Sequence, residues 1–348
     1  MKIHILNTGG TLGMVGNPLR PAKSAVELLE GVNITEGSEL SLVDFPERQD
    51  STNVKHSDRI EMGKIVGEIY DDHDAFIILH GTDSLAETCG FLCMMFKLSL
   101  QKPLFVIGAQ MTKDEPGTDV PMQIANTIRV AQAFVRNNIV GVYNVCIGNV
   151  LHGARIRKRR DSDFEAFYTP GMDPVAQSWP HILIKDNIRR KDGVLHVQGL
   201  RFDVNFESRV ATFKTSADTP PTVLMTLVEK AALNGVILEC KGAGNIPDRS
   251  FEGGSSWIDA ISMATKAGVH VGILSPFEDG RVNLNRYELG KKAKDAGAIS
   301  LESLTPDMAD VKFRQAIAMH KGNPKRIQEF ISMNILGELL PGFEDVTT

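Results

Sequence analysis

The feature that most constrains the fold is a repeated alternation of short apolar runs with longer amphipathic stretches. Helical patterns such as Leu85–Leu98 and Pro121–Arg136 separate the apolar runs. Strands that alternate with helices are typical of a doubly wound, mainly parallel sheet. The strand candidates of the first half are Lys2–Asn7, Glu39–Phe45, Ala75–Leu79, Pro103–Gly108 and Val142–Gly148.

The pattern changes near residue 180. The stretch 182–202 has hairpin character, with Lys191-Asp192-Gly193 as its turn, and 207–221 has linker character and ends in a Pro pair. Apolar runs of strand length then resume at Thr222–Leu227, Gly235–Glu239, His270–Leu274 and Ala298–Ser303, and a last helix is expected over 327–340. We therefore expect a larger N-terminal catalytic α/β domain (1–200), a linker (201–221) and a smaller C-terminal α/β domain (222–348).

Composition excludes several classes of partner. The net charge of -5 over 348 residues gives no bulk electrostatic reason to bind nucleic acid or acidic membranes. No apolar run approaches the roughly 20 residues that span a bilayer. The N-terminus lacks the apolar region of a signal peptide, so we expect a cytoplasmic protein. The cysteines are expected to be buried free thiols: Cys89, Cys93, Cys146 and Cys240.

Polar groups follow each strand candidate of the first half. Ligands of open α/β sheets bind beyond the carboxyl ends of the strands, so these groups are expected to meet at one edge. They are found in Thr8-Gly9-Gly10-Thr11, in Asp50-Ser51-Thr52, in His80-Gly81-Thr82-Asp83-Ser84, in Gly108-Ala109-Gln110 and in the stretch 149–160. Hydroxyls, carboxylates and a lysine at one edge indicate chemistry on a polar small molecule.

The Thr8–Thr11 turn allows two interpretations. A phosphate cradle is poorly supported, because the stretch is neither G-x-G-x-x-G nor a P-loop. A Gly pair after a strand is most often a tight turn. The alternative is a nucleophilic hydroxyl, which needs a base to take its proton.

The second threonine motif supplies candidates for that base. Thr82 has Asp83 beside it, and Lys158 lies within the basic run Arg155–Arg160. A solvated charged loop would account for this run equally well. The functional hypothesis is that the arginines disfavour protonation of Lys158, which could then act as a base.

Six blocks together resemble the bacterial-type L-asparaginases, and most closely their cytoplasmic type I branch. The blocks are NTGGTLGM, DSTN, LHGTDSLAET, VIGAQ, HGARIRKRRDSDFEAF and GAGNIPD. They occur in the order found in the family and cover most of the chain. The resemblance implies hydrolysis of the side-chain amide of L-asparagine to L-aspartate and ammonia, by a two-domain α/β protein that needs no metal or organic cofactor.

The resemblance also implies roles for individual residues. Thr11 corresponds to the primary nucleophile, and Thr82, Asp83 and Lys158 correspond to a proton relay. By this resemblance, Ser51, Thr52 and Asp83 hold the substrate. Asp50 is added because its carboxylate can hold the substrate ammonium, and Thr82 and Asn245 complete the expected substrate-binding set. Asn245 matches a residue that the family contributes from a neighbouring subunit, which implies a homodimer or homotetramer.

The sequence departs from the family pattern in the loop after Thr11. The family places a tyrosine there, whereas Leu19 stands at the matching position, and Arg20 is a weak candidate for a group that covers the site instead. The acid from the neighbouring subunit is either Glu278 or Glu288.

Several functions therefore remain open at this stage. They are hydrolysis of asparagine, hydrolysis of another amide such as glutamine, a component of a tRNA-dependent amidotransferase, a non-catalytic amino-acid-binding protein and a nucleotide-binding domain. An amidotransferase component is expected to carry an extra N-terminal domain, and this sequence starts at the first strand. The dinucleotide fingerprint is missing for the last option.

Overall fold

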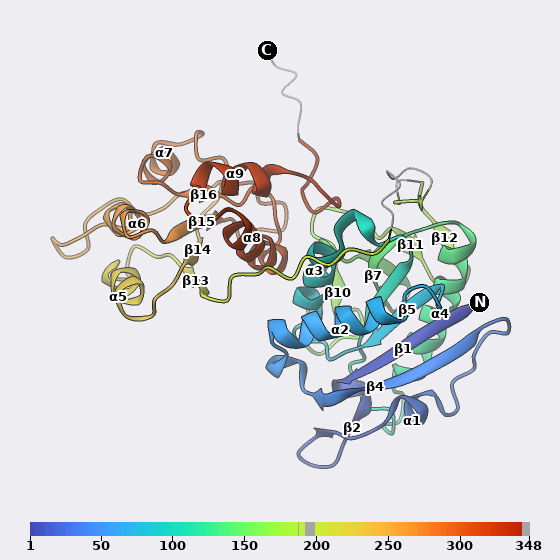
Figure 1. Cartoon of the computed structure of the whole chain (residues 1–348). Helices are drawn as coiled ribbons and strands as arrows, with labels where there is room; N and C mark the ends of the chain where they lie inside the picture. Colours follow the sequence, from blue (N-terminus) through green and yellow to red (C-terminus); the bar gives the residue numbers. More distant parts are fainter. Residues whose placement is uncertain (187, 192–198, 343–348) are drawn as a thin grey trace. The chain divides into compact units, whose positions relative to one another are not determined.

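The computed structural model describes residues 1–186, 188–191 and 199–342, and these fall into two compact units, Met1–Val204 and Asn205–Thr348 (Figure 1). The predicted hairpin turn at Lys191-Asp192-Gly193 lies largely outside the described residues. Each unit contains a parallel sheet with helices packed on it, so the predicted fold class is confirmed.

The N-terminal unit contains the elements of the first half of the alternation. Its helices are α1 (Ala25–Leu29), α2 (His56–Glu68), α3 (Leu85–Phe96) and α4 (Val120–Arg136). Its strands are β1 (Lys2–Gly9), β2 (Met14–Val15), β3 (Arg20–Pro21), β4 (Glu39–Gln49), β5 (Ala75–Leu79), β6 (Pro103–Ile107), β7 (Gly141–Cys146), β8 (Asn149–His152), β9 (Arg157–Lys158), β10 (Phe167–Tyr168), β11 (Ala176–Gln177) and β12 (Leu183–Ile184).

The main sheet of this unit has the order β12-β11-β8-β7-β6-β5-β1-β4 among the described residues. The strands β4, β1, β5, β6 and β7 are parallel neighbours, and β8, β11 and β12 extend the sheet in antiparallel fashion. This antiparallel extension departs from the loop expected over 149–160. β8 turns back along β7, and β9 follows it.

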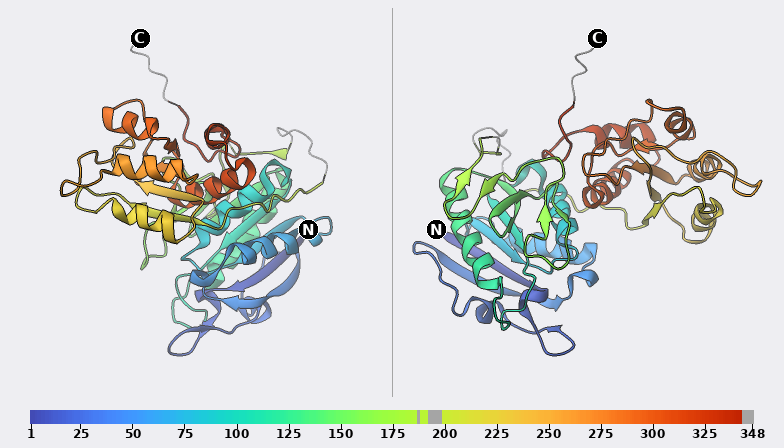
Figure 2. Two further views of the ribbon diagram at one scale, coloured as in Figure 1. Left: turned by 60° about the vertical axis from the view of Figure 1, so that its left-hand side comes forward. Right: turned by 180° about the vertical axis from the view of Figure 1, so that it is seen from behind.

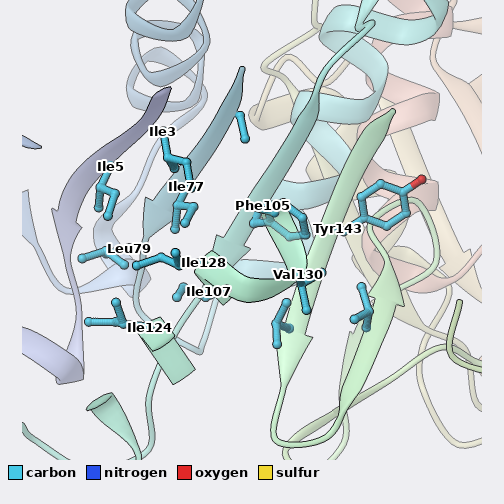
Figure 3. Close-up of a cluster of buried hydrophobic side chains, with 14 of the residues drawn as sticks. Ile3, Ile5, Ile77, Leu79, Phe105, Ile107, Ile124, Ile128, Val130 and Tyr143 are labelled. Carbon is cyan, nitrogen blue, oxygen red and sulfur yellow. The ribbon is translucent and has the colours of Figure 1, made fainter. Parts of the chain in front are cut away.

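Both faces of the parallel strands are buried, which explains why β5 and β6 are apolar throughout. Ile3, Ile5 and Ile77 point from alternate positions toward Ile124 and Ile128 of α4 (Figure 3). The opposite face carries α3, which contacts β6 and β7 and packs on α2, and the views of Figure 2 show the sheet between the two helical layers.

The C-terminal unit repeats the same architecture on a smaller scale. Its parallel sheet has the order β13 (Val210–Lys214), β14 (Gly235–Glu239), β15 (His270–Leu274) and β16 (Ile299–Ser300). Its helices are α5 (Thr222–Lys230), α6 (Trp257–Lys266), α7 (Glu288–Asp295), α8 (Pro306–His320) and α9 (Pro324–Ser332).

Three expectations for this unit are wrong. The stretch expected to be a linker contains β13, an edge strand whose inward and outward side chains alternate. Thr222–Leu227 is the start of α5, because Pro220 and Pro221 fix a backbone that suits the first turn of a helix. The last helix also ends earlier than expected, at Ser332.

A buried ion pair fixes the segment after α9. Lys312 of α8 and Glu338 are each fully buried, with 2.7 Å between Nζ and Oε1. The same ammonium donates to the Ile331 carbonyl, while the Glu338 carboxylate accepts from the backbone N–H groups of Ile335 and Leu336. Every charge-bearing atom of the pair thus has polar partners, as burial of a charge requires.

Two further sequence predictions concern the whole chain. All four cysteines are buried and free, as predicted. Within the described residues, no helix combines the length and the apolar character needed to cross a membrane.

Candidate active site

The predicted site residues of the N-terminal unit lie at the carboxyl edge of the parallel sheet. β1 stands between β4 and β5, so the connections that leave β1 and β4 run in opposite directions across the sheet. Such a reversal of strand order leaves a crevice beyond the strand ends. The turns that follow β1, β4 and β5 border this point, and they carry the threonine and aspartate motifs.

The turn after β1 lies directly against the turn after β5. Gly10 has φ 86° and ψ 177°, a conformation that is essentially restricted to glycine. A Cβ on Gly10 would lie 2.3 Å from both Cα and N of Gly81. The Gly pair is therefore explained by close approach of two backbones, and the N–H of Gly10 is bound to the Gln49 carbonyl at 3.1 Å.

The two threonines of the first motif differ in their surroundings. Thr8 is buried and donates its hydroxyl proton to the Leu79 carbonyl at 2.8 Å, so it joins β1 to β5. Thr11 opens a short 3-10 helix and is only half-buried. Its hydroxyl forms no hydrogen bond within the described part of the chain. Of the two, Thr11 is the hydroxyl available to a ligand.

The structure brings Thr82, Asp83 and Lys158 together, although 76 positions separate Thr82 from Lys158. The ammonium of Lys158 donates to Thr82 Oγ1 at 3.0 Å and to Asp83 Oδ1 at 2.6 Å. A third N–H donates to Asp161 Oδ1 at 3.0 Å, so all three ammonium protons have acceptors. Because Thr82 accepts from Lys158, its own proton is free to point elsewhere.

The hypothesis that the arginine run suppresses protonation of Lys158 is wrong. Burial acts to lower the pKa of Lys158, but the hydrogen bonds and charges of Asp83 and Asp161 outweigh it, and the net pKa lies above the ordinary value. Arg155 is buried and donates to the Pro170 carbonyl, and Arg160 pairs with Asp163 at 2.5 Å. Lys158 is thus an ammonium in this state.

The turn after β4 adds Ser51, Thr52 and Asp50. Ser51 is buried, and its carbonyl accepts the Ser84 hydroxyl proton at 2.6 Å, which ties this turn to the turn after β5. Asp50 caps the short helix by accepting from the Thr52 N–H at 2.9 Å. Thr52 is exposed, so it faces solvent at this edge.

A buried hydrogen-bond chain fixes the backbone just before Thr82. Burial lowers the pKa of His80 to about 4, so its ring is neutral near pH 7. Nδ1 must donate to the Gly81 carbonyl at 2.7 Å, since a carbonyl only accepts. Nε2 then accepts from the Thr88 hydroxyl at 3.1 Å, and Thr88 in turn accepts from Arg59 at 3.0 Å. This chain selects one tautomer of His80 and orients the Gly81 peptide.

Three predicted positions lie in the C-terminal unit. Asn245 is half-buried and follows β14 in a turn closed by mutual backbone hydrogen bonds with Lys241. Glu278 is exposed in the loop after β15. Glu288 begins α7, and its carboxylate forms an ion pair with Lys292 of the same helix at 2.8 Å.

Two side chains that line one cavity, Asp161 and Gln110, have no role in the sequence prediction. Asp161 is not among the candidates, although its spacing of three residues from Lys158 is a usable signal. Gln110 stands out in the sequence only as part of a motif. Its side-chain nitrogen is buried and has no hydrogen-bond partner among the described residues.

The loop that lacks the tyrosine forms a small hairpin of β2 and β3. Leu19 lies at its tip and is 52% exposed, and Arg20 is exposed as well. The base of the loop is fixed by the buried Asn7, whose amide donates to the Lys23 carbonyl at 3.0 Å.

Comparison with known proteins agrees with this geometry. The sequence profile described as Asparaginase, N-terminal matches residues 2–189. The chain belongs to the asparaginase family. The profile of the Glutaminase/Asparaginase C-terminal domain matches residues 209–331, so both units correspond to asparaginase domains, and the predicted resemblance is confirmed.

Relatives within the asparaginase family carry two different names. An L-asparaginase from Thermococcus kodakarensis is 27% identical over 97% of this chain and 99% of its own length. A glutamyl-tRNA(Gln) amidotransferase component from Sulfurisphaera tokodaii is 28% identical over 97% of this chain and 75% of its own length. A solved structure of the T. kodakarensis L-asparaginase has a TM-score of 0.86 at 26% identity and covers 98% of this chain and 100% of its own.

L-Asparaginase I from Vibrio cholerae shares the asparaginase fold with this chain. Its structure has a TM-score of 0.84 at 23% identity and covers 98% of this chain and 99% of its own. The two-domain α/β architecture is therefore common to this chain and to asparaginases of different organisms.

Proposed function

We propose that this asparaginase-family chain hydrolyses the side-chain amide of L-asparagine to L-aspartate and ammonia. The observation that carries the proposal is the contact of Lys158 Nζ with both Thr82 Oγ1 (3.0 Å) and Asp83 Oδ1 (2.6 Å) at the edge where Thr11 offers a free hydroxyl. A protein that only bound an amino acid would have no need for a lysine on a threonine hydroxyl.

In the proposed reaction, the Thr11 oxygen attacks the amide carbon. The C–N bond breaks, the nitrogen gains the hydroxyl proton through the relay and leaves as ammonia, and an ester to Thr11 remains. Water then adds to the ester carbon, the bond to Thr11 breaks, and the proton of the attacking water returns to the threonine oxygen. Backbone N–H groups of the Gly-rich turns are the proposed donors to the oxyanion.

Substrate binding supplies the step that frees Lys158 to accept a proton. The α-ammonium of asparagine is proposed to bind Asp83 and Asp50, with the α-carboxylate on Ser51 and Thr52. A second cation on Asp83 repels the Lys158 ammonium and weakens its ion pair, so the pKa of Lys158 falls on binding. Lys158 therefore cannot act as a base in the resting enzyme and becomes able to do so when substrate binds.

The amidotransferase components among the relatives support a second candidate. In that role the same amide chemistry would supply ammonia to a tRNA-dependent reaction on a partner protein. The chain covers 75% of the S. tokodaii protein, and 59% of a Pyrococcus abyssi amidotransferase component that is 30% identical over 76% of this chain. Efficient turnover of free asparagine by the isolated protein favours the first function, and turnover only with a partner favours the second.

The deciding measurement is ammonia release from L-asparagine and L-glutamine at neutral pH. Thr11→Val removes the hydroxyl at nearly constant shape, and Thr35→Val, at an exposed threonine, is the matched control. We expect release from asparagine by the wild type and the control, and none by Thr11→Val. Release by Thr11→Val at the wild-type rate would show that another group is the nucleophile, and light scattering would test the predicted dimer or tetramer.

A further inference from the structure

Two carboxylates, not one, hold the lysine of the relay. Asp83 reaches Lys158 from the turn after β5, and Asp161 reaches it from the loop between β9 and β10. The proposed reaction assigns a role to Asp83 and to the two threonine motifs but none to Asp161. Because the proposed substrate ammonium competes for Asp83, Asp161 is the carboxylate that stays with the lysine during turnover.

We propose that Asp161 is a positioning residue that retains Lys158 in its ammonium form and thereby sets the acid limit of turnover. This inference rests on the proposed function, in which Lys158 must lose a proton to serve as a base. Asp161 acts through Lys158 and is not placed in contact with the substrate.

The groups around Lys158 show which side chains can influence its protonation. Phe167 is the cross-strand neighbour of Lys158 on β10 and is apolar. On its own loop, Arg159 lies over the Tyr168 ring, with Cζ 5.0 Å from the ring centroid, and 3.9 Å from Glu165. Among the described residues, the carboxylates within 4.0 Å of Lys158 Nζ are those of Asp83 and Asp161.

Solvent access predicts a modest and salt-dependent effect. The Asp161 side chain is 89% exposed, whereas that of Lys158 is 17% exposed. Asp161 lines a cavity of about 520 Å³ together with Gln110, Met111, Ser162, Asp163 and Phe164. An exposed ion pair is screened by water and salt, so Asp161 favours the ammonium form of Lys158 by a small amount that falls as the salt concentration rises.

The test compares Asp161→Asn with Asp163→Asn. Asp163 lines the same cavity two positions away, but it pairs with Arg160, so its substitution changes the net charge equally without touching Lys158. We expect the acid limb of kcat, which reports groups of the enzyme–substrate complex, to move to lower pH by about 0.2 to 0.7 units in Asp161→Asn only. This shift is a gain in rate of about 1.6-fold to fivefold on that limb. High salt should move the wild-type limb in the same direction and leave that of Asp161→Asn less affected.

A titration that does not depend on turnover separates this inference from the proposed function. The ¹³Cε resonance of Lys158 is assigned by its loss in Lys158→Met and is followed against pH. A lower midpoint in Asp161→Asn than in Asp163→Asn supports the inference even if no amide is hydrolysed. Equal midpoints and equal pH profiles in the two variants would overturn it, whatever the substrate.

Discussion

Gly10→Ala tests whether the contact between the two threonine turns is required for the site. The new Cβ would lie 2.3 Å from Gly81 Cα, whereas ordinary van der Waals contact begins near 3.4 Å, so the turns must separate by about 1 Å. The glycine-only conformation costs about 1 to 3 kcal/mol, and the overpacking costs about as much again. We expect a loss of about 2 to 6 kcal/mol in the free energy of unfolding. A displacement of about 1 Å should also lower turnover about 100-fold in the protein that remains folded.

The assay needs a control glycine that also has a positive φ but whose new Cβ would meet no other atom. Gly37 is exposed, has φ +90°, and a Cβ there would meet nothing within 4 Å. Gly37→Ala should therefore cost only about 1 to 2 kcal/mol and leave turnover unchanged. Urea unfolding and ammonia release are measured on both variants at a temperature where both are folded. If Gly10→Ala matched Gly37→Ala in both measurements, close backbone approach would not be what the site requires.

Three further outcomes can be checked. The pKa of His80 is about 4 in the folded chain and near 6.5 when unfolded, so the free energy of unfolding should fall by roughly 3 kcal/mol as pH drops through this window. His80→Asn should make the free energy of urea unfolding depend less on pH between about pH 6.5 and 4.5. An unchanged pH dependence in this variant would contradict the buried neutral ring. Asn7→Ala should cost about 1 to 3 kcal/mol in urea unfolding, because the Gly9 N–H loses its acceptor, whereas the exposed Asn33→Ala should cost nearly nothing, and equal losses would refute this. Thr82→Val should abolish ammonia release while the far-ultraviolet circular dichroism is unchanged, and near-normal release would remove Thr82 from the relay.

The parallel sheet of the N-terminal unit is predictable because its strands are buried on both faces. β5 is predicted with its observed bounds and β6 to within one residue, since apolar runs of this length between helical patterns have few alternatives. The short strands β8 to β12 are not predictable. Most contain two residues, and they are defined by backbone pairing with another short strand rather than by an apolar pattern of their own.

The C-terminal unit shows where local patterns mislead. The run at 222–227 has the length of a strand, but the preceding proline pair and the apolar spacing of Val223, Leu224, Leu227 and Val228 favour a helix. β13 is an edge strand, and its sequence includes the exposed polar residues Thr212 and Lys214. These polar residues make the segment resemble a linker in sequence.

The site is predictable in its members more than in its electrostatics. The rule that ligands bind at the carboxyl edge selects Thr11, Thr82 and Lys158 as side chains of one edge or one cluster. The protonation of Lys158 depends on which charges point at it, and sequence gives proximity along the chain only. The adjacent arginines turn to other partners, while Asp161, three residues away, folds back onto the lysine.

The buried pair of Lys312 and Glu338 determines how far the chain can be shortened. Removal of the residues from Glu338 onward would take the Glu338 carboxylate away from the buried Lys312 ammonium, and loss of one partner of such a pair costs about 3 to 5 kcal/mol. Expression variants trimmed upstream of Glu338 should therefore be recovered as insoluble or proteolysed protein, whereas variants that retain Glu338 keep the buried ion pair. For protein engineering, a C-terminal truncation of this chain should therefore retain Glu338.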